Sequence, residues 1–184
     1  MAEESYFDQI SNQIKTGNEP FKWYRNRIKE FGAPSQRELL RDGRLAGRYH
    51  IGRLNMFVYD PKLKQKLPYY DTFPLVLPIK RYSDGFLGIN FHYLPYALRA
   101  RLLDQITRIG GRGSKEDMQI IANFQRLERV KLIRPTIKRY LNNHVRSRFR
   151  RIDSEDFLTA IMLPVQRFVK GSTSKVWSDS RKAI

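Results

Sequence analysis

The 184-residue chain contains no cysteine, which excludes a disulfide framework, a thiolate zinc site and a cysteine nucleophile. No uninterrupted apolar run approaches the about 20 residues that span a bilayer, so a membrane segment is not expected. Acidic residues are scarce, at 18 against 35 lysines and arginines, and the formal net charge is +17 at pH 7. The 41% of hydrophobic and 12% of aromatic residues are sufficient for one folded domain with a core.

The positive charge is concentrated in one stretch of the sequence. Residues 96–152 hold fifteen basic and four acidic residues, which give this stretch a net charge of +11. A field of this strength repels the chain itself and attracts polyanions. The expected partner is therefore a phosphate backbone or an equally acidic protein surface.

Hydrophobic spacing divides the chain into two parts. Residues 1–46 predict an N-terminal arm of three short helices, in which Tyr6, Ile10 and Ile14 recur at a spacing of four. Residues 47–184 predict an α+β domain. Its expected architecture is a small, bent, antiparallel SH3-like β-barrel that carries a basic helical insertion at residues 96–145 and is followed by C-terminal helices.

Strand patterns fill residues 49–93, which alternate along the chain or are rich in branched and aromatic side chains. Within them, Ser83-Asp84-Gly85 predicts a tight hairpin, because an Asp-Gly pair tolerates positive φ. Pro74 and Pro78 cannot donate ladder hydrogen bonds and indicate an edge strand or a sharply bent one. Residues 146–152 are the expected closing strand.

Helical spacing dominates the basic stretch. The apolar residues of the first predicted helix are Leu98, Leu102, Ile106 and Ile109. Arg99 is expected on a remaining, polar face of that helix. A second helix is predicted over residues 114–130, and a third begins near Pro135. The apolar stripe of the third helix would consist of Ile137, Tyr140, Leu141, His144 and Val145. Two C-terminal helices are predicted over residues 153–163 and 172–181.

Basic side chains in this stretch are the candidate binding residues, because arginine grips phosphate oxygens bidentately and few acids compensate the charge. If the chain is extended there, Arg146, Arg148 and Arg150 share one face, whereas in a helix they fan around its end. The candidate DNA-binding residues are Arg112, Lys115, Lys131, Arg134, Lys138, Arg139, Arg146, Arg148, Arg150 and Arg151. A solvated charged face and contacts with an acidic protein are the alternatives. No pattern typical of base readout is present, so sequence-independent binding is expected.

Patterns of catalysis are missing. The run Gly110-Gly111-Arg112-Gly113-Ser114-Lys115 lacks phosphate-loop spacing, and a mobile basic loop is the preferred interpretation. Asp60, Asp71 and Asp84 lie in or beside turns, where aspartate usually caps the backbone, and the three histidines are far apart. We therefore predict no metal, no cofactor and no enzymatic activity.

The aromatic residues allow two interpretations. The clusters Tyr69-Tyr70 and Phe86, Phe91, Tyr93 and Tyr96 could stack on exposed bases, but core packing is the more typical role of such residues. Trp23 and Trp177 are expected to anchor the two ends of the chain onto the body or onto another subunit.

Distinctive strings occur at residues 59–76, 83–95, 98–104, 144–150 and 176–181. These segments resemble proteins of T4-like contractile-tailed bacteriophages. The family that they resemble is that of the DNA end protectors, minor virion proteins held to bind the ends of the packaged genome and shield them from host exonuclease. The resemblance covers about residues 47–184, and the N-terminal helices fall outside it.

This resemblance implies a non-enzymatic virion protein whose partners are the ends of double-stranded DNA and other virion proteins. It also implies a location in the virion, and in the host cytoplasm during assembly and after genome delivery. The alternative is a structural subunit of the phage neck, tail or baseplate. In that case the basic face would bind acidic neighbouring subunits rather than DNA.

Overall fold

The structure, a computed structural model, describes residues 45–110, 129–153 and 156–184. The predicted N-terminal arm lies outside these residues, apart from Leu45 and Ala46, which form a short strand. The predicted helix over 114–130 and the candidates Arg112 and Lys115 also lie outside them, except for residues 129 and 130.

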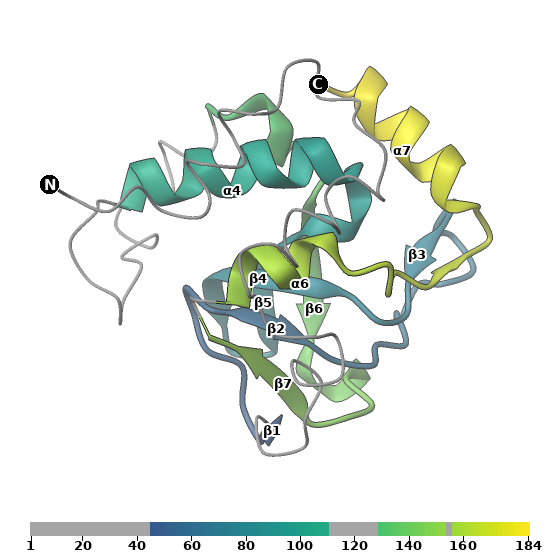
Figure 1. The fold of residues 1–184 in the computed structure, drawn as a ribbon. Helices are drawn as coiled ribbons and strands as arrows, with labels where there is room; N and C mark the ends of the chain where they lie inside the picture. Colours follow the sequence, from purple (N-terminus) through teal and green to yellow (C-terminus); the bar gives the residue numbers. More distant parts are fainter. Residues whose placement is uncertain (1–44, 111–128, 154–155) are drawn as a thin grey trace, which may run out of the picture.

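A six-stranded antiparallel sheet forms the centre of the described chain, in the order β1-β7-β2-β4-β5-β6 (Figure 1). Its strands are β1 (Leu45–Ala46), β2 (Leu54–Met56), β4 (Leu75–Tyr82), β5 (Gly85–Asn90), β6 (Ile137–Leu141) and β7 (Phe149–Ile152). A second, two-stranded sheet pairs β3 (Tyr70–Asp71) with β8 (Phe168–Val169). The predicted α+β class is confirmed. The end strands β1 and β6 do not pair, so the sheet is not closed, and the SH3-like barrel stays a prediction.

The predicted hairpin joins β4 to β5. Tyr82 pairs with Gly85, which leaves Ser83 and Asp84 as a two-residue turn. Positive φ does not explain Gly85, because the described residues with positive φ are Gly52 and Lys170. A Cβ on Gly85 would lie 1.9 Å from the carbonyl oxygen of Tyr140 on β6. The close approach of two strands, and not a left-handed turn, requires glycine here.

Pro78 lies on an interior strand, so the expectation of an edge strand is wrong and that of a bent strand holds. The register between β4 and β5 shifts between Pro78 and Lys80, as at a β-bulge. Bulges accommodate a residue that cannot donate to the ladder. The carbonyl oxygen of Pro78 instead accepts a hydrogen bond from the amide of Gly52 at 3.1 Å.

The predicted third helix after Pro135 is wrong. Its residues form β6 and the short 3-10 helix η5 (Asn142–His144). β6 pairs with β5 along its whole length, and this non-local pairing overrides a spacing that alone fits a helix. Ile137 and Tyr140 consequently pack into different cores. The closing strand predicted over 146–152 is confirmed as β7, which pairs with β1 and β2.

Two of the predicted helices are confirmed with nearly their expected bounds, α4 (Tyr96–Gly110) and α7 (Thr173–Lys182). The Ser172 hydroxyl caps α7 by accepting from the amide of Lys175. Helix α6 (Phe157–Met162) is shorter than predicted, and its N-cap, Asp156, makes no side-chain capping bond. Two 3-10 helices, η2 (Phe91–Tyr93) and η4 (Lys131–Ile133), complete the described elements. No described helix is both long and apolar enough to cross a membrane.

The sheet carries one apolar core on each face. Leu54, Leu77 and Ile89 pack with Leu102 of α4 and Ile161 of α6 on the face that these helices cover (Figure 1). The other face holds an aromatic core of Phe57, Tyr59, Val76, Phe86, Tyr140 and Phe149. Phe86 and Phe91 are fully buried, and Tyr93 and Tyr96 nearly so. Core packing, and not base stacking, is therefore the role of this aromatic cluster.

Candidate nucleic-acid interface

Six of the ten predicted residues lie on β6 or on the chain beside its two ends. Lys138 and Arg139 lie on β6, an end strand that pairs with β5 alone among the described strands, and Lys131 and Arg134 precede it at η4. Arg146 and Arg148 follow η5, where the chain crosses to Val58 after β2 and to Leu45 of β1. We call these six residues the basic edge: Lys131, Arg134, Lys138, Arg139, Arg146 and Arg148. The residues predicted for the third helix thus lie on an edge strand and on the chain that leads from it to β7.

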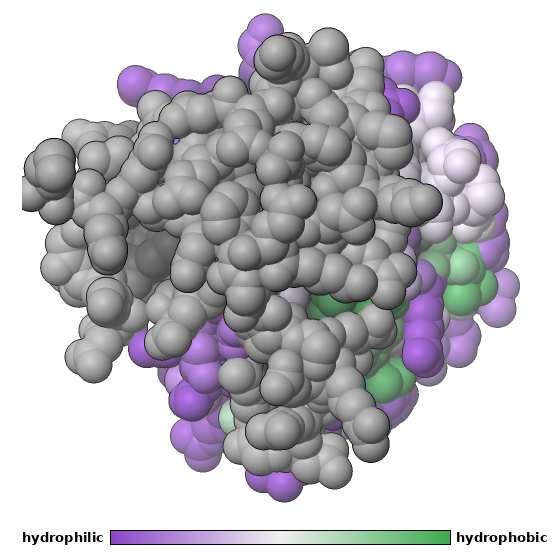
Figure 2. Space-filling model, viewed as in Figure 1, coloured by the Kyte–Doolittle hydropathy of each residue, from purple (hydrophilic) through white to green (hydrophobic). Residues whose placement is uncertain are grey.

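Most of the basic edge faces solvent. Lys131, Arg134, Arg139, Arg146 and Arg148 are exposed. Within the described chain, Lys131 and Arg134 have no ion-pair partner, and Arg148 donates to the Leu45 carbonyl oxygen at 3.5 Å. Figure 2 shows hydrophilic residues along the lower margin of the described surface. Three cations of the basic edge, Lys131, Arg134 and Arg148, are thus exposed and pair with no carboxylate of the described chain.

Three of the predicted arginines form ion pairs within the chain. Arg139 pairs with Asp84, Arg146 with Asp60 at 3.9 Å, and Arg151 with Asp153 at 3.4 Å. All six side chains are at least one third exposed, and solvent-exposed pairs contribute about 0–1 kcal/mol to stability. Such arginines are free to exchange a carboxylate for a phosphate at little cost.

Lys138 differs from its neighbours on the basic edge. Its side chain is half-buried, and its Nζ lies 4.1 Å from the centroid of the Tyr93 ring. Burial lowers the pKa of Lys138 to about 8. Because its side chain is half-buried, unlike that of Arg139, Lys138 is not among the proposed DNA contacts.

Arg150 and Arg151 lie on β7, an interior strand between β1 and β2, and both are half-buried. The chain from Val145 to Arg148 is not helical, so the helical alternative for Arg146, Arg148 and Arg150 is wrong. Arg150 and Arg151 add positive charge within the sheet and are not part of the basic edge.

Sequence reasoning missed basic residues near the β4–β5 hairpin. Lys80 and Arg81 are exposed at the end of β4, and Arg53 lies in the turn that bonds to β4. The pKa of His50 is lowered by burial and then by the charges of Arg151, Arg53 and Arg81, which shows that these groups gather around it. The sequence signal for these residues is the excess of basic over acidic residues in residues 48–95. It was overlooked because the excess in residues 96–152 is larger.

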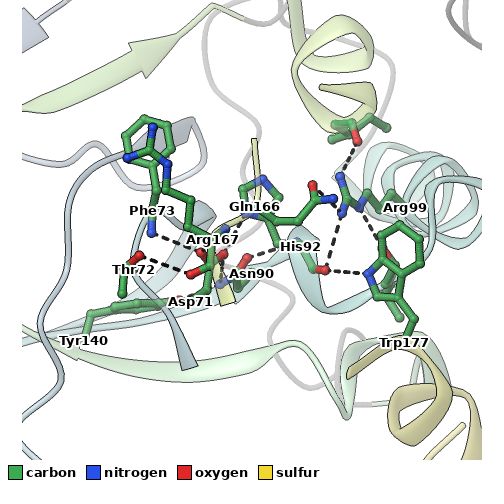
Figure 3. Close-up of polar contacts among 12 residues, drawn as sticks. Asp71, Thr72, Phe73, Asn90, His92, Arg99, Tyr140, Gln166, Arg167 and Trp177 are labelled. Atoms are coloured by element: carbon green, nitrogen blue, oxygen red, sulfur yellow. Dashed lines mark hydrogen bonds and ion pairs between the residues drawn. The ribbon is translucent and has the colours of Figure 1, made fainter. Parts of the chain in front are cut away.

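The interior holds a buried polar network centred on Asp71 (Figure 3). One carboxylate oxygen accepts from the amides of Phe73 at 3.0 Å and Arg167 at 3.1 Å. The other accepts from Asn90 Nδ2 at 3.3 Å and lies 2.7 Å from His92 Nδ1. The expectation that Asp71 caps backbone amides is confirmed, and His92 is a packed, hydrogen-bonded residue. No group of three potential metal-ligating side chains occurs in the part of the chain that the structure describes.

Arg99, expected on a polar helix face, is fully buried, so that expectation is wrong. Its guanidinium donates to the carbonyl oxygens of Leu94 at 2.7 Å and Ile161 at 2.9 Å (Figure 3). It also lies against the ring faces of Tyr96 and Trp177, at 4.6 and 5.6 Å from their centroids. Burial lowers the pKa of Arg99 to about 10, so it remains charged at neutral pH. This arginine joins α4 to α6 and does not face DNA.

Trp177 anchors the C-terminal helix, as predicted. Its indole nitrogen donates to the carbonyl oxygen of His92 at 2.9 Å, and its ring packs edge-on against Tyr96. The same carbonyl oxygen accepts from Arg99 at 3.4 Å, so α4 and α7 meet at η2 (Figure 3). Trp23, its predicted counterpart, lies outside the described residues.

The stability of the protein is expected to fall below pH 6.5 because of His92. Burial lowers the pKa of its imidazole, against the opposing effect of Asp71, and its Nε2 has no hydrogen-bond partner in the described chain. In the unfolded chain the imidazole regains its usual pKa of 6.5 and binds a proton there. The unfolded state therefore binds more protons below that pH, and the free energy of unfolding decreases as the pH falls.

Urea unfolding at pH 7.5 and pH 5.5 measures this effect. The wild-type protein should be less stable at the lower pH, and His92→Asn, which keeps an N–H donor toward Asp71, should lose most of that difference. An equal pH dependence in the two proteins would assign the effect to other groups. Burial raises the pKa of the Asp71 carboxyl, but His92 and two backbone amides lower it further, so the pKa lies below its usual value of 3.8. Asp71 therefore adds a further loss of stability only below about pH 3.8.

Exposed bases with few compensating acids are typical of the class of proteins that bind polyanions through their charge. The family model described as Phage T4 terminal DNA protecting protein matches residues 6–180. The chain therefore belongs to this family, and its predicted function, protection of DNA ends by a bacteriophage protein, is confirmed. The match begins at residue 6, so the expectation that the N-terminal segment lies outside the family is wrong. No curated protein and no solved structure matches the chain significantly.

Proposed function

We propose that the protein protects DNA ends without catalysis, by binding the terminal duplex through the basic edge and excluding exonucleases sterically. The observation that carries this proposal is the group of exposed bases between Lys131 and Arg148, of which Lys131, Arg134 and Arg148 pair with no described carboxylate. Occlusion of an end requires only slow dissociation, so no bond-breaking group is needed.

The proposed contacts are to phosphates and not to bases. The exposed cations lie on η4, an edge strand and the segment after η5, and none of these is a helix long enough to enter a groove. Phosphate contacts position a protein on a duplex but carry no sequence information. Binding is therefore independent of sequence. Arg112 and Lys115 belong to the same basic stretch, and we propose that they add to these contacts.

The proposed setting is the virion, beside other virion proteins, with release into the host cytoplasm together with the genome. We also propose that the open sheet is an SH3-like barrel in its connectivity. The supporting features are the bridge between Tyr59 and Val145 and the bond from the Arg146 amide to the Val58 carbonyl oxygen at 2.8 Å. Both bring the chain after η5 back toward the extension of β2.

A competition experiment tests end binding. A labelled linear duplex bound to the protein is displaced by unlabelled linear duplex or by the same sequence closed into a circle, over a series of salt concentrations. The linear competitor should displace the label at lower concentration, and the affinity for both should fall as salt rises. Equal displacement by the two competitors would contradict end binding. Loss of all DNA near physiological salt, with retention of acidic virion proteins, would favour a structural subunit of the neck, tail or baseplate.

A further inference from the structure

One aromatic side chain in the described chain is exposed. Tyr82, at the end of β4, is 37% exposed, whereas the other described aromatic residues are buried or half-buried. The ring makes no contact with the aromatic core on the opposite sheet face. An exposed aromatic group that contributes little to a core is available for a ligand.

The backbone holds Tyr82 in a fixed position. It pairs with Gly85 across the two-residue turn, and Gly85 pairs in turn with Leu141 on β6. The carbonyl oxygen of Asp84 accepts from the amide of Asn142 at 2.9 Å, which ties the turn to the end of β6. The residue opposite Tyr82 has no side chain, so none covers the ring from that position.

Two cations lie over the ring, so a base pair that stacks on it displaces them toward its phosphates. The Arg139 guanidinium carbon lies 4.1 Å from the centroid of the Tyr82 ring, and the Lys80 Nζ lies 5.3 Å from it. Lys80 and Tyr82 are two residues apart on β4 and therefore share a sheet face. Leu87 pairs with both Lys80 and Arg139, so the two cations lie in one row across three strands. Asp84 is the single acid of the turn, and it pairs with Arg139.

The end of a duplex offers a surface that its interior lacks. Every phosphate of the backbone attracts the basic edge in the same way, so phosphate contacts alone give no preference for ends. The terminal base pair, however, exposes one flat face to solvent. Aromatic side chains stack on such faces whatever the base, because every base has a π-face.

We infer that the tip of the β4–β5 hairpin reads the DNA end: Tyr82 stacks on the terminal base pair, and Lys80 and Arg139 contact the phosphates beside it. This inference rests on the proposed binding of duplex ends by the basic edge. Arg139 belongs to both surfaces, so the hairpin tip continues the line of phosphate contacts to the point where the duplex stops. The ligand is the blunt or nearly blunt terminus of a duplex of any sequence.

The test compares Tyr82→Ala and Tyr82→Phe with the wild-type protein on linear and circular duplex of one sequence. Tyr82→Ala should weaken binding to linear duplex by about fivefold to a hundredfold and leave binding to the circle unchanged. Tyr82→Phe, which keeps the ring, should behave as the wild type. A 2-aminopurine base at the terminal position should change its fluorescence on binding the wild type and Tyr82→Phe but not Tyr82→Ala, whereas an internal 2-aminopurine should not respond.

Two results would overturn the inference, and only one of them also contradicts the proposed binding of DNA ends. If Tyr82→Ala keeps the wild-type preference for linear duplex, Tyr82 does not read the end, but end binding itself survives. If the wild-type protein binds circle and linear duplex equally, end binding fails and this inference fails with it. Tyr82 packs into neither core, so Tyr82→Ala is expected to fold, and its urea unfolding curve verifies this.

Discussion

Replacement of Asp71 by alanine is expected to lower the free energy of unfolding by about 3–5 kcal/mol. The carboxylate is buried and accepts from two backbone amides, from Asn90, and from the imidazole of His92. Without it, these donors are left in an apolar interior where water cannot replace the lost acceptor. The same change removes a negative charge that opposes, through the electrostatic field, the lowering of the Arg99 pKa by burial.

Urea unfolding measures this loss, with Asp84→Ala as the matched control. Asp84 is also an aspartate with a basic partner, but its side chain is 65% exposed, so its removal should cost less than about 1 kcal/mol. Asp71→Asn keeps the shape and one acceptor oxygen and should fall between the two. A cost for Asp71→Ala as small as that for Asp84→Ala would show that the network does not stabilise the fold.

Removal of three charges from the basic edge is expected to weaken DNA binding by about 500-fold at 0.1 M salt. The change is the triple variant Lys131→Ala, Arg134→Ala and Arg148→Ala. Each phosphate neutralised on duplex DNA contributes about 0.9 to the slope of log affinity against log salt, so three lost contacts lower that slope by about 2.7. The three side chains are exposed, and such substitutions usually change stability by no more than about 0.5 kcal/mol.

A triple variant on α7 is the control for net charge. Lys175→Ala, Arg181→Ala and Lys182→Ala remove the same number of positive charges from exposed positions outside the basic edge. This control should bind nearly as the wild type and keep its salt slope. If both triple variants lose equal affinity and show the same decrease in salt slope, the overall charge of the protein binds DNA. The basic edge would then make no specific contribution.

Local signals in the sequence predicted the local structure well. The hairpin between β4 and β5, the helix α4 and the serine-capped helix α7 each depend on residues close together in the chain. Turn residues and caps act within a few residues, and a spacing of three and four residues buries one helix face. These elements need no knowledge of distant partners.

Non-local pairing explains the errors in the fold. The residues of β6 have a spacing that fits a helix, and only the presence of β5 beside them selects a strand. Arg99 has helical neighbours on a polar face, yet the carbonyl oxygens of Leu94 and Ile161 and two aromatic rings create a buried site for it. Ile161 is 62 residues away in the sequence, so no local pattern predicts this contact.

The sequence predicted the positive charge of the candidate site but not the arrangement of its side chains. The excess of basic residues in 96–152 singled out Lys131, Arg134, Arg146 and Arg148, and the structure leaves these four side chains exposed. It also included Lys138, which the ring of Tyr93 holds half-buried. Tyr82 escaped attention because its exposure depends on where the hairpin ends relative to the two cores, which composition does not reveal.

The most direct test of the central claim is the rate at which an exonuclease digests a linear duplex with and without the protein, at moderate salt. Binding at the ends predicts that the wild-type protein delays the start of digestion, and that the basic-edge triple variant does so far less. An internally nicked circle, which has no duplex terminus, should gain no comparable protection from an enzyme that starts at nicks. Equal digestion of the linear duplex with and without the wild-type protein would contradict the account.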